Sequence, residues 1–173
     1  MAHTIFVTGG ARSGKSRLAE GLAAGYGAPL GYIATGRAGD AEMAERIARH
    51  RARRGPAWRT VEEPEDIAGA ISANEGSCNA LLVDCVTLWL TNLLLKYDDG
   101  ARALEEVAAL VRLLPELQTP LILVSNEVGM GIVPENALAR AFRDLAGEAS
   151  EMLARAADEV YVMFSGLPMK LKG

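Results

Sequence analysis

The stretch that decides the fold is residues 4–25, TIFVTGGARSGKSRLAEGLAAG. Its middle part matches the pattern GxxxxGK[ST] in full and reads Gly9-Gly10-Ala11-Arg12-Ser13-Gly14-Lys15-Ser16. In such a loop the glycines let backbone N–H groups point at phosphate oxygens, the lysine reaches the β- and γ-phosphates, and the serine hydroxyl binds Mg²⁺. An apolar run precedes the motif and a helical pattern follows it, as a phosphate-binding P-loop requires. We therefore predict that residues 9–16 contact a nucleotide and that Lys15 is also catalytic.

Outward from this loop, short apolar runs alternate with longer helical patterns. Runs typical of strands buried on both faces of a sheet lie at residues 4–7, 30–34, 80–83, 121–124 and 160–163. Helical patterns lie at residues 16–25, 40–54, 64–73, 86–96, 101–114 and 135–157, with Pro64 and Pro134 expected at helix starts and Gly100 as a break. This alternation predicts parallel strands with helices on both faces. We predict one α/β domain over residues 1–173, a three-layer P-loop NTPase fold with a mainly parallel sheet.

An acidic residue follows another of the apolar runs. A P-loop usually has such a partner at the end of a second strand, where it holds Mg²⁺ directly or through water. Asp84 comes directly after residues 80–83 and fits that role together with Ser16. An aspartate here would also serve as the N-cap of a helix that starts near Val86. We favour the metal site, because the P-loop makes an acidic partner expected.

The helical segment 40–54 is strongly basic and carries one of the two histidines of the chain. His50 lies one turn from Arg46 and from Arg54. Like charges so close favour the neutral imidazole, which can attack phosphorus, and the arginines could hold the phosphates under attack. The same arginines would suit the negative end of a helix. From this helix alone, His50 is a candidate nucleophile and no more.

Composition and charge exclude several classes of function. A formal net charge of −4 argues against a general nucleic-acid binder. The first residues lack the pattern of a signal peptide, and the most apolar stretch, residues 81–95, is interrupted by polar residues and too short to cross a bilayer. Cys78 and Cys85 have no metal-binding spacing and are expected as core thiols. We expect a cytoplasmic protein with no nucleic-acid partner and no membrane insertion.

The motifs taken together resemble one family. The segments that carry the resemblance are residues 8–17, 32–35, 42–43, 46–47, His50, 58–60, Glu62, 91–94, 126–136, 156–160 and 165–166. The run at 126–136, NEVGMGIVPEN, is far more specific than the P-loop. Over essentially its full length the chain resembles the bifunctional adenosylcobinamide kinase and adenosylcobinamide-phosphate guanylyltransferase of cobalamin biosynthesis.

This resemblance implies two reactions. The first would phosphorylate the aminopropanol hydroxyl of adenosylcobinamide with ATP or GTP. The second would transfer GMP from GTP to adenosylcobinamide phosphate through a GMP–histidine intermediate on His50, giving adenosylcobinamide-GDP and pyrophosphate. The resemblance also implies a homo-oligomer, and the Mg²⁺ expected at Ser16 and Asp84 would serve both reactions. The nucleotide contacts that it implies are Gly9, Gly10, Ala11, Arg12, Ser13, Gly14, Lys15, Ser16, Ala34, Thr35, Gly36, Arg51, Ala52, Arg53, Arg54, Glu62 and Asp84.

Two other functions fit the residues alone. A P-loop small-molecule kinase without a covalent intermediate would share the phosphate loop and Mg²⁺ but would give His50 no necessary role. A regulatory nucleotide-binding module would switch shape without acting on a metabolite, although 173 residues leave little room for an effector domain.

Overall fold

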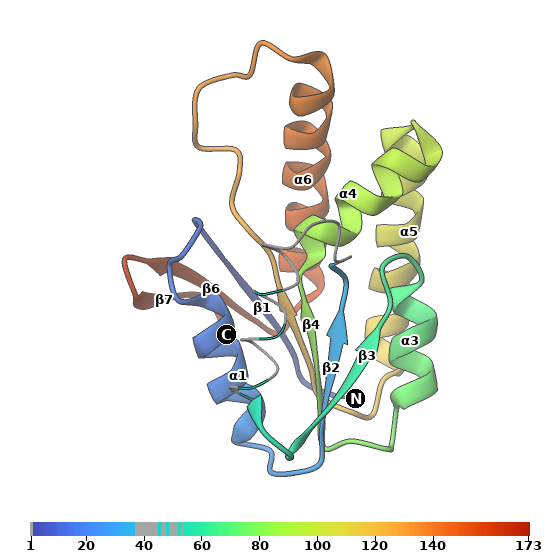
Figure 1. The fold of residues 1–173 in the computed structure, drawn as a ribbon, viewed down its shortest axis with the longest axis vertical. Coiled ribbons are helices and arrows are strands. Elements are labelled where there is room, and N and C mark those ends of the chain that lie inside the picture. The colour runs from blue at the N-terminus through green and yellow to red at the C-terminus, as the bar shows by residue number, and fades with distance from the viewer. Residues whose placement is uncertain (1, 37–44, 46–47, 49–51, 53) are drawn as a thin grey trace.

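The sheet at the centre of the molecule takes its strands from almost the whole sequence, from Thr4 to Lys172. The computed structural model describes residues 2–36, 45, 48, 52 and 54–173. Its 7-stranded sheet has the order β3-β2-β4-β5-β1-β6-β7 (Figure 1). The strands are β1 (Thr4–Gly9), β2 (Leu30–Ala34), β3 (Trp58–Glu62), β4 (Ala80–Asp84), β5 (Leu121–Val124), β6 (Glu159–Phe164) and β7 (Leu167–Lys172). Neighbouring strands are parallel except β6 and β7, which are antiparallel.

Helices cover both faces of this sheet, which confirms the predicted three-layer P-loop NTPase fold (Figure 1). They are α1 (Lys15–Ala24), α3 (Ile67–Asn74), α4 (Val86–Tyr97), α5 (Gly100–Leu113), a 3-10 turn (Leu114–Glu116) and α6 (Ala137–Ala156). Helix α1 packs on one face, and α3 to α6 pack on the other. In β4, Leu81 and Val83 join the core under α3 to α6, whereas Leu82 joins the core under α1. Alternate side chains of a strand point to opposite faces, so a strand buried on both sides is apolar throughout.

Two expected helix starts are wrong by a few residues. Helix α3 begins at Ile67 rather than near Pro64, because the side chain of Asp66 caps it by accepting a hydrogen bond from the Gly69 N–H. Helix α6 begins at Ala137 rather than after Pro134, because Asn136 caps it through the Ala139 N–H. A capping side chain therefore fixes each start, and the preceding proline only opens the loop before it. Gly100, expected as a break, is the first residue of α5.

The strands β3 and β7 lie at the two edges of the sheet and were not predicted. Every residue of β7 is exposed, and β3 is only half-buried. Edge strands lack the continuous apolar runs by which buried strands are recognised. The predicted helix 40–54 lies mostly outside the described residues; its described members, at 45, 48, 52 and 54, are helical. Among the helices that the structure describes, none has the length and apolar character needed to span a membrane.

Candidate active site

The P-loop joins the carboxyl end of β1 to α1. Gly9 has φ 142°, and a Cβ there would lie 2.5 Å from the backbone oxygen of Met163 on the neighbouring strand β6. Gly14, the N-cap of α1, has φ 96°, a conformation that favours glycine. The loop thus needs glycine at both ends to turn from strand to helix. It delivers its backbone N–H groups and the N-terminus of α1 to the same place, which is the arrangement that binds phosphates.

The lysine of the motif is buried inside this loop. Lys15 exposes 7% of its surface. Its Nζ donates to the Gly10 oxygen at 2.5 Å and lies 3.5 Å from Ser13 Oγ. The loop therefore keeps the ammonium group among the backbone amides that would hold the phosphates.

Ser16, in the first turn of α1, contacts Asp84, the last residue of β4. Ser16 Oγ donates to Asp84 Oδ2 at 2.9 Å, although 68 residues separate them. Oxygen donors of this kind suit Mg²⁺, which commonly takes one or two protein ligands and fills its shell with water and substrate phosphates. In the described residues no group of three or more His, Cys, Asp or Glu could hold a metal ion. The residues present thus fit a magnesium ion that is shared with a nucleotide.

The alternative role of Asp84 as a helix cap is not what the structure shows. The N-cap of α4 is Cys85, and no side chain caps that end. Burial and the Asp84 carboxylate raise the pKa of the Cys85 thiol to about 11, so it stays a neutral core group. Cys78 is likewise buried and free, as expected for a core thiol.

The register of the sheet brings three predicted contact regions side by side. Ala34, the last residue of β2, pairs with Glu62 of β3 on one side and with Asp84 of β4 on the other. Thr35 follows and is fully buried. Its hydroxyl accepts a hydrogen bond from the Cys85 N–H and donates one to the Cys85 oxygen, so no polar atom of this buried side chain is left without a partner. Asn92 of α4 donates to the Thr35 oxygen at 2.9 Å. The Thr35 side chain thus ties β2 to β4, and the carboxyl ends form one continuous edge.

Arg54 packs onto this edge from the basic segment. Its guanidinium carbon lies 3.4 Å from the ring centroid of Tyr32, a buried residue of β2. Burial, followed by the Asp84 carboxylate, raises the pKa of Tyr32 above its ordinary range. Nε and Nη1 of Arg54 are buried without a hydrogen-bond partner in the part of the chain that the structure describes. Arg54 and Asp84 thus both lie near Tyr32, and the buried donors of Arg54 could pair with a nucleotide phosphate.

The remaining predicted site residues divide into two groups. Glu62 is exposed at the carboxyl end of β3, and Ala52 is exposed and helical. His50, Arg51 and Arg53 lie outside the described residues. His3, the other histidine, lies before β1, with Nε2 3.1 Å from Glu159 Oε1 and Nδ1 3.6 Å from Asp158 Oδ2. It thus sits at the opposite end of β1 from the P-loop.

Sequence reasoning gave no role to Glu127, which the structure places at the P-loop. Glu127 follows β5, and its N–H donates to the oxygen of Gly9 at 2.9 Å. Like Asp84, Glu127 lies near the carboxyl end of a buried strand, but Ser125 and Asn126 come between it and β5, so the sequence pattern does not single it out.

These features define a P-loop nucleotide-binding protein. The chain belongs to the family described as cobinamide kinase / cobinamide phosphate guanyltransferase, whose model matches residues 5–171. It is a bifunctional enzyme of this family, as the resemblance in its sequence predicted.

Sequence relatives support the family assignment, and solved structures support the fold. The chain is 52% identical over 167 residues to the bifunctional adenosylcobalamin biosynthesis protein CobP of Pseudomonas aeruginosa, covering 96% of each. It is 44% identical over 180 residues to the bifunctional adenosylcobalamin biosynthesis protein CobU of Escherichia coli, covering 97% of this chain and 99% of that one. Its fold is similar to that of the flagellar accessory protein FlaH of Methanocaldococcus jannaschii, with a TM-score of 0.54, 14% identity, and coverage of 98% and 78%. That likeness concerns the fold alone.

Proposed function

We propose that this enzyme phosphorylates adenosylcobinamide with ATP or GTP and then transfers GMP from GTP to adenosylcobinamide phosphate. The observation that carries the proposal is the contact of Ser16 with Asp84 beside the buried Lys15, in a chain of the cobinamide kinase / cobinamide phosphate guanyltransferase family. One phosphate-binding site can serve both reactions, because each begins with an anchored purine triphosphate.

In the kinase reaction, catalysis is mostly positioning and charge neutralisation. The backbone of residues 9–14 and the Lys15 ammonium hold the triphosphate and stabilise the charge that develops on the transferred group. Mg²⁺ held by Ser16 and Asp84 would neutralise charge on the β- and γ-phosphates.

In the guanylyl transfer, His50 is the proposed nucleophile. Its imidazole attacks the α-phosphorus of GTP, the bond to the β-phosphate oxygen breaks, and pyrophosphate leaves. A phosphate oxygen of adenosylcobinamide phosphate then attacks the same phosphorus and releases the imidazole. His3 is not suited to this role, because it lies between Asp158 and Glu159 at the far end of β1. The family resemblance implies a histidine on the helical segment after the second strand, and His50 is the residue that matches it.

Nucleotide contacts from the other strands complete the proposal. Arg54, which packs on Tyr32, would pair with the phosphates, together with Arg51, Ala52 and Arg53 of the same segment. Residues 34–36 and Glu62 would contact the nucleoside, and the Glu62 carboxylate would accept hydrogen bonds from the N1–H and amino group of guanine.

Labelling with GTP that carries a radioactive α-phosphate tests the proposal. After denaturation we expect label on the protein that is stable in alkali and labile in acid, as a phosphoramidate is. His50→Ala should abolish the label, whereas His3→Ala, the matched control, should retain it. A kinase without a covalent intermediate, or a regulatory nucleotide switch, would give no label at all. Absence of label from the folded, GTP-binding wild-type enzyme would contradict the covalent step.

A further inference from the structure

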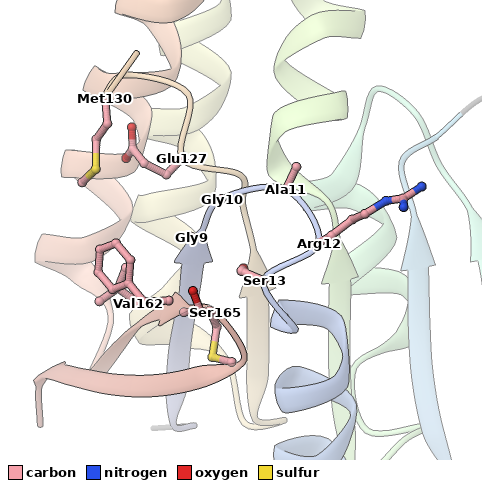
Figure 2. A pocket seen from close by; sticks show the side chains of 11 residues that line it. Gly9, Gly10, Ala11, Arg12, Ser13, Glu127, Met130, Val162 and Ser165 are labelled. Carbon is pink, nitrogen blue, oxygen red and sulfur yellow. The ribbon is translucent and has the colours of Figure 1, made fainter.

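A cavity lies against the P-loop on the side of β6. Its volume is about 390 Å³. The residues that line it are Gly9, Gly10, Ala11, Arg12, Ser13, Glu127, Met130, Val162, Met163, Phe164 and Ser165. Figure 2 shows Glu127 and Met130 on one side of the cavity, Val162 and Ser165 on another, and Gly9 and Gly10 between them. One wall is therefore the backbone that is expected to hold the phosphates.

The chemistry of the walls does not suit another phosphate. The Glu127 carboxylate would repel an anion, and the Arg12 side chain points away from Glu127 and Met130 (Figure 2). Met130, Val162, Met163 and Phe164 make much of the remaining wall apolar. A neutral group that carries a hydroxyl fits such a space better, because the carboxylate can accept its proton.

The position of Glu127 is fixed relative to the P-loop. Its N–H donates to Gly9, and its Oε1 accepts the Gly129 N–H, which holds the side chain. The preceding residue is fixed as well, because the Asn126 N–H donates to Thr87 Oγ1 of α4 at 2.7 Å. A group tied in this way to the P-loop backbone can act on an atom next to the γ-phosphate.

We propose that this cavity receives the hydroxyl arm of the phosphoryl acceptor and that Glu127 is the general base of the kinase step. The inference rests on the proposed function. The hydroxyl oxygen attacks the γ-phosphorus, the bond from that phosphorus to the β–γ bridging oxygen breaks, and the nucleoside diphosphate leaves. The hydroxyl proton passes to the Glu127 carboxylate and from there to solvent.

The surroundings of the cavity fit the rest of such an acceptor. A corrinoid ring is far too large for 390 Å³, so only its side arm can enter. The loop between β5 and α6 extends beyond the carboxyl ends of the strands (Figure 1). In this loop Met130 is 76% exposed and Ile132 is 98% exposed. Exposed apolar side chains next to a cavity suit a large, partly apolar ligand that stays outside it.

The test separates the two half-reactions in Glu127→Gln. The amide oxygen of glutamine can still accept the Gly129 N–H, so the loop should keep its structure, but it cannot take up a proton. We expect kcat of the kinase step to fall about 10²- to 10⁴-fold. Covalent GMP labelling and GMP transfer to ready-made adenosylcobinamide phosphate should stay within about twofold of wild type. Glu148→Gln, an exposed position on α6, is the matched control and should leave both reactions unchanged.

Two further readouts distinguish a base from a structural group. The acidic limb of the wild-type pH profile of kinase kcat should be absent in Glu127→Gln. Met130→Ala should raise KM for adenosylcobinamide, by up to about tenfold, without changing GMP labelling.

Three outcomes would overturn the inference. Unchanged kinase turnover in Glu127→Gln would remove Glu127 from the chemistry. Equal loss of both half-reactions, with a raised Mg²⁺ requirement, would place it at the nucleotide rather than at the acceptor. A wild-type enzyme that labels with GMP but phosphorylates no cobinamide would refute the kinase part of the proposed function, and the inference with it.

Discussion

Lys15 is the cation that the phosphate loop would present to a bound triphosphate. Its ammonium is buried and bonded to the Gly10 oxygen and Ser13 Oγ within the phosphate loop itself. Both proposed reactions need an anchored triphosphate, so we predict that Lys15→Ala slows both by about 30- to 1000-fold, or about 2–4 kcal/mol. Lys96→Ala, which removes a surface lysine paired with Glu65, is the control. Wild-type turnover of folded Lys15→Ala would take the P-loop out of the mechanism.

If Asp84 holds Mg²⁺, its substitution should weaken Mg²⁺-dependent turnover, whereas substitution of a helix cap would lower stability. Its carboxylate accepts the Ser16 hydroxyl, whereas α4 begins without a side-chain cap. We predict that Asp84→Asn raises the Mg²⁺ concentration needed for half-maximal turnover, while the urea midpoint of unfolding changes little. Titration of activity with Mg²⁺ and unfolding of the same preparation provide the two measurements. A collapsed midpoint with normal Mg²⁺ dependence would show that Asp84 acts through stability.

Glu62 is the proposed reader of the base. It ends β3 in register with Ala34, at the same edge as Asp84. A carboxylate accepts from both guanine donors, whereas the N1 of adenine is itself an acceptor, so we predict that Glu62→Gln reduces the preference for GTP over ATP in the guanylyl step. The measurement is the ratio of kcat/KM for the two nucleotides. An unchanged ratio would assign base recognition to another residue.

Whether a strand could be predicted from the sequence depended on how far it is buried. The strands β1, β2, β4, β5 and β6 were all predicted, because each contains a run of four or five mostly buried residues that are almost all apolar. The edge strands β3 and β7 were missed, because half or all of their residues face solvent. Helix starts depended on single capping side chains, Asp66 and Asn136, which a preceding proline obscures.

A charged cluster connects β6, β7 and the residue before β1, at the end of the sheet opposite the P-loop. Glu159 of β6 accepts the Tyr161 hydroxyl at 2.6 Å and lies 3.2 Å from Lys170 of β7 and 3.1 Å from His3. The Tyr161 hydrogen bond, followed by those from Lys170 and His3, lowers the pKa of Glu159 from 4.5 to about 2. A pKa that is lower in the folded state adds stability above pH 4.5, which is lost as the pH falls toward 2.

We therefore predict that Glu159→Gln lowers the free energy of unfolding at neutral pH and flattens its decline in acid. Denaturant unfolding at a series of pH values, on wild type and variant, gives the difference curve. That difference should shrink as the pH falls from 4.5 toward 2. Glu148→Gln, exposed on α6, should follow the wild-type curve. A difference that is constant with pH would mean that Glu159 contributes by packing rather than by charge.

On the scale of the whole molecule, the site is assembled along one edge of the sheet. The P-loop, Ala34, Glu62, Asp84 and Glu127 lie at or just after the ends of five different strands. Only some of this was accessible from the sequence. The P-loop carries its own pattern, and Asp84 stands out after an apolar run. The adjacency of Glu62 to Asp84 depends on strand order, and the packing of Arg54 on Tyr32 depends on a tertiary contact, neither of which leaves a local pattern.

Although both proposed reactions would use this edge of the sheet, a single substitution should remove one reaction and spare the other. We predict that His50→Ala abolishes GMP labelling and guanylyl transfer, while phosphorylation of the corrinoid hydroxyl survives at least in part. Phosphoryl transfer depends on Lys15, Ser16 and Mg²⁺, which the substitution leaves in place. Nucleotidyl transfer through a covalent intermediate needs a nitrogen nucleophile at the α-phosphorus, which alanine lacks. Arg54 remains, so nucleotide binding should weaken only modestly.

The decisive comparison measures both half-reactions on one folded preparation of His50→Ala, with GTP binding measured in parallel. Glu127→Gln is its counterpart, because that variant is expected to lose the kinase step and keep the label. Opposite losses in the two variants would mean that one phosphate loop serves two separable chemistries, with the nucleophile on the basic segment and the base after β5. Retained GMP labelling in His50→Ala would exclude His50 as the nucleophile. Equal loss of both steps, together with lost GTP binding, would make His50 a nucleotide-binding residue.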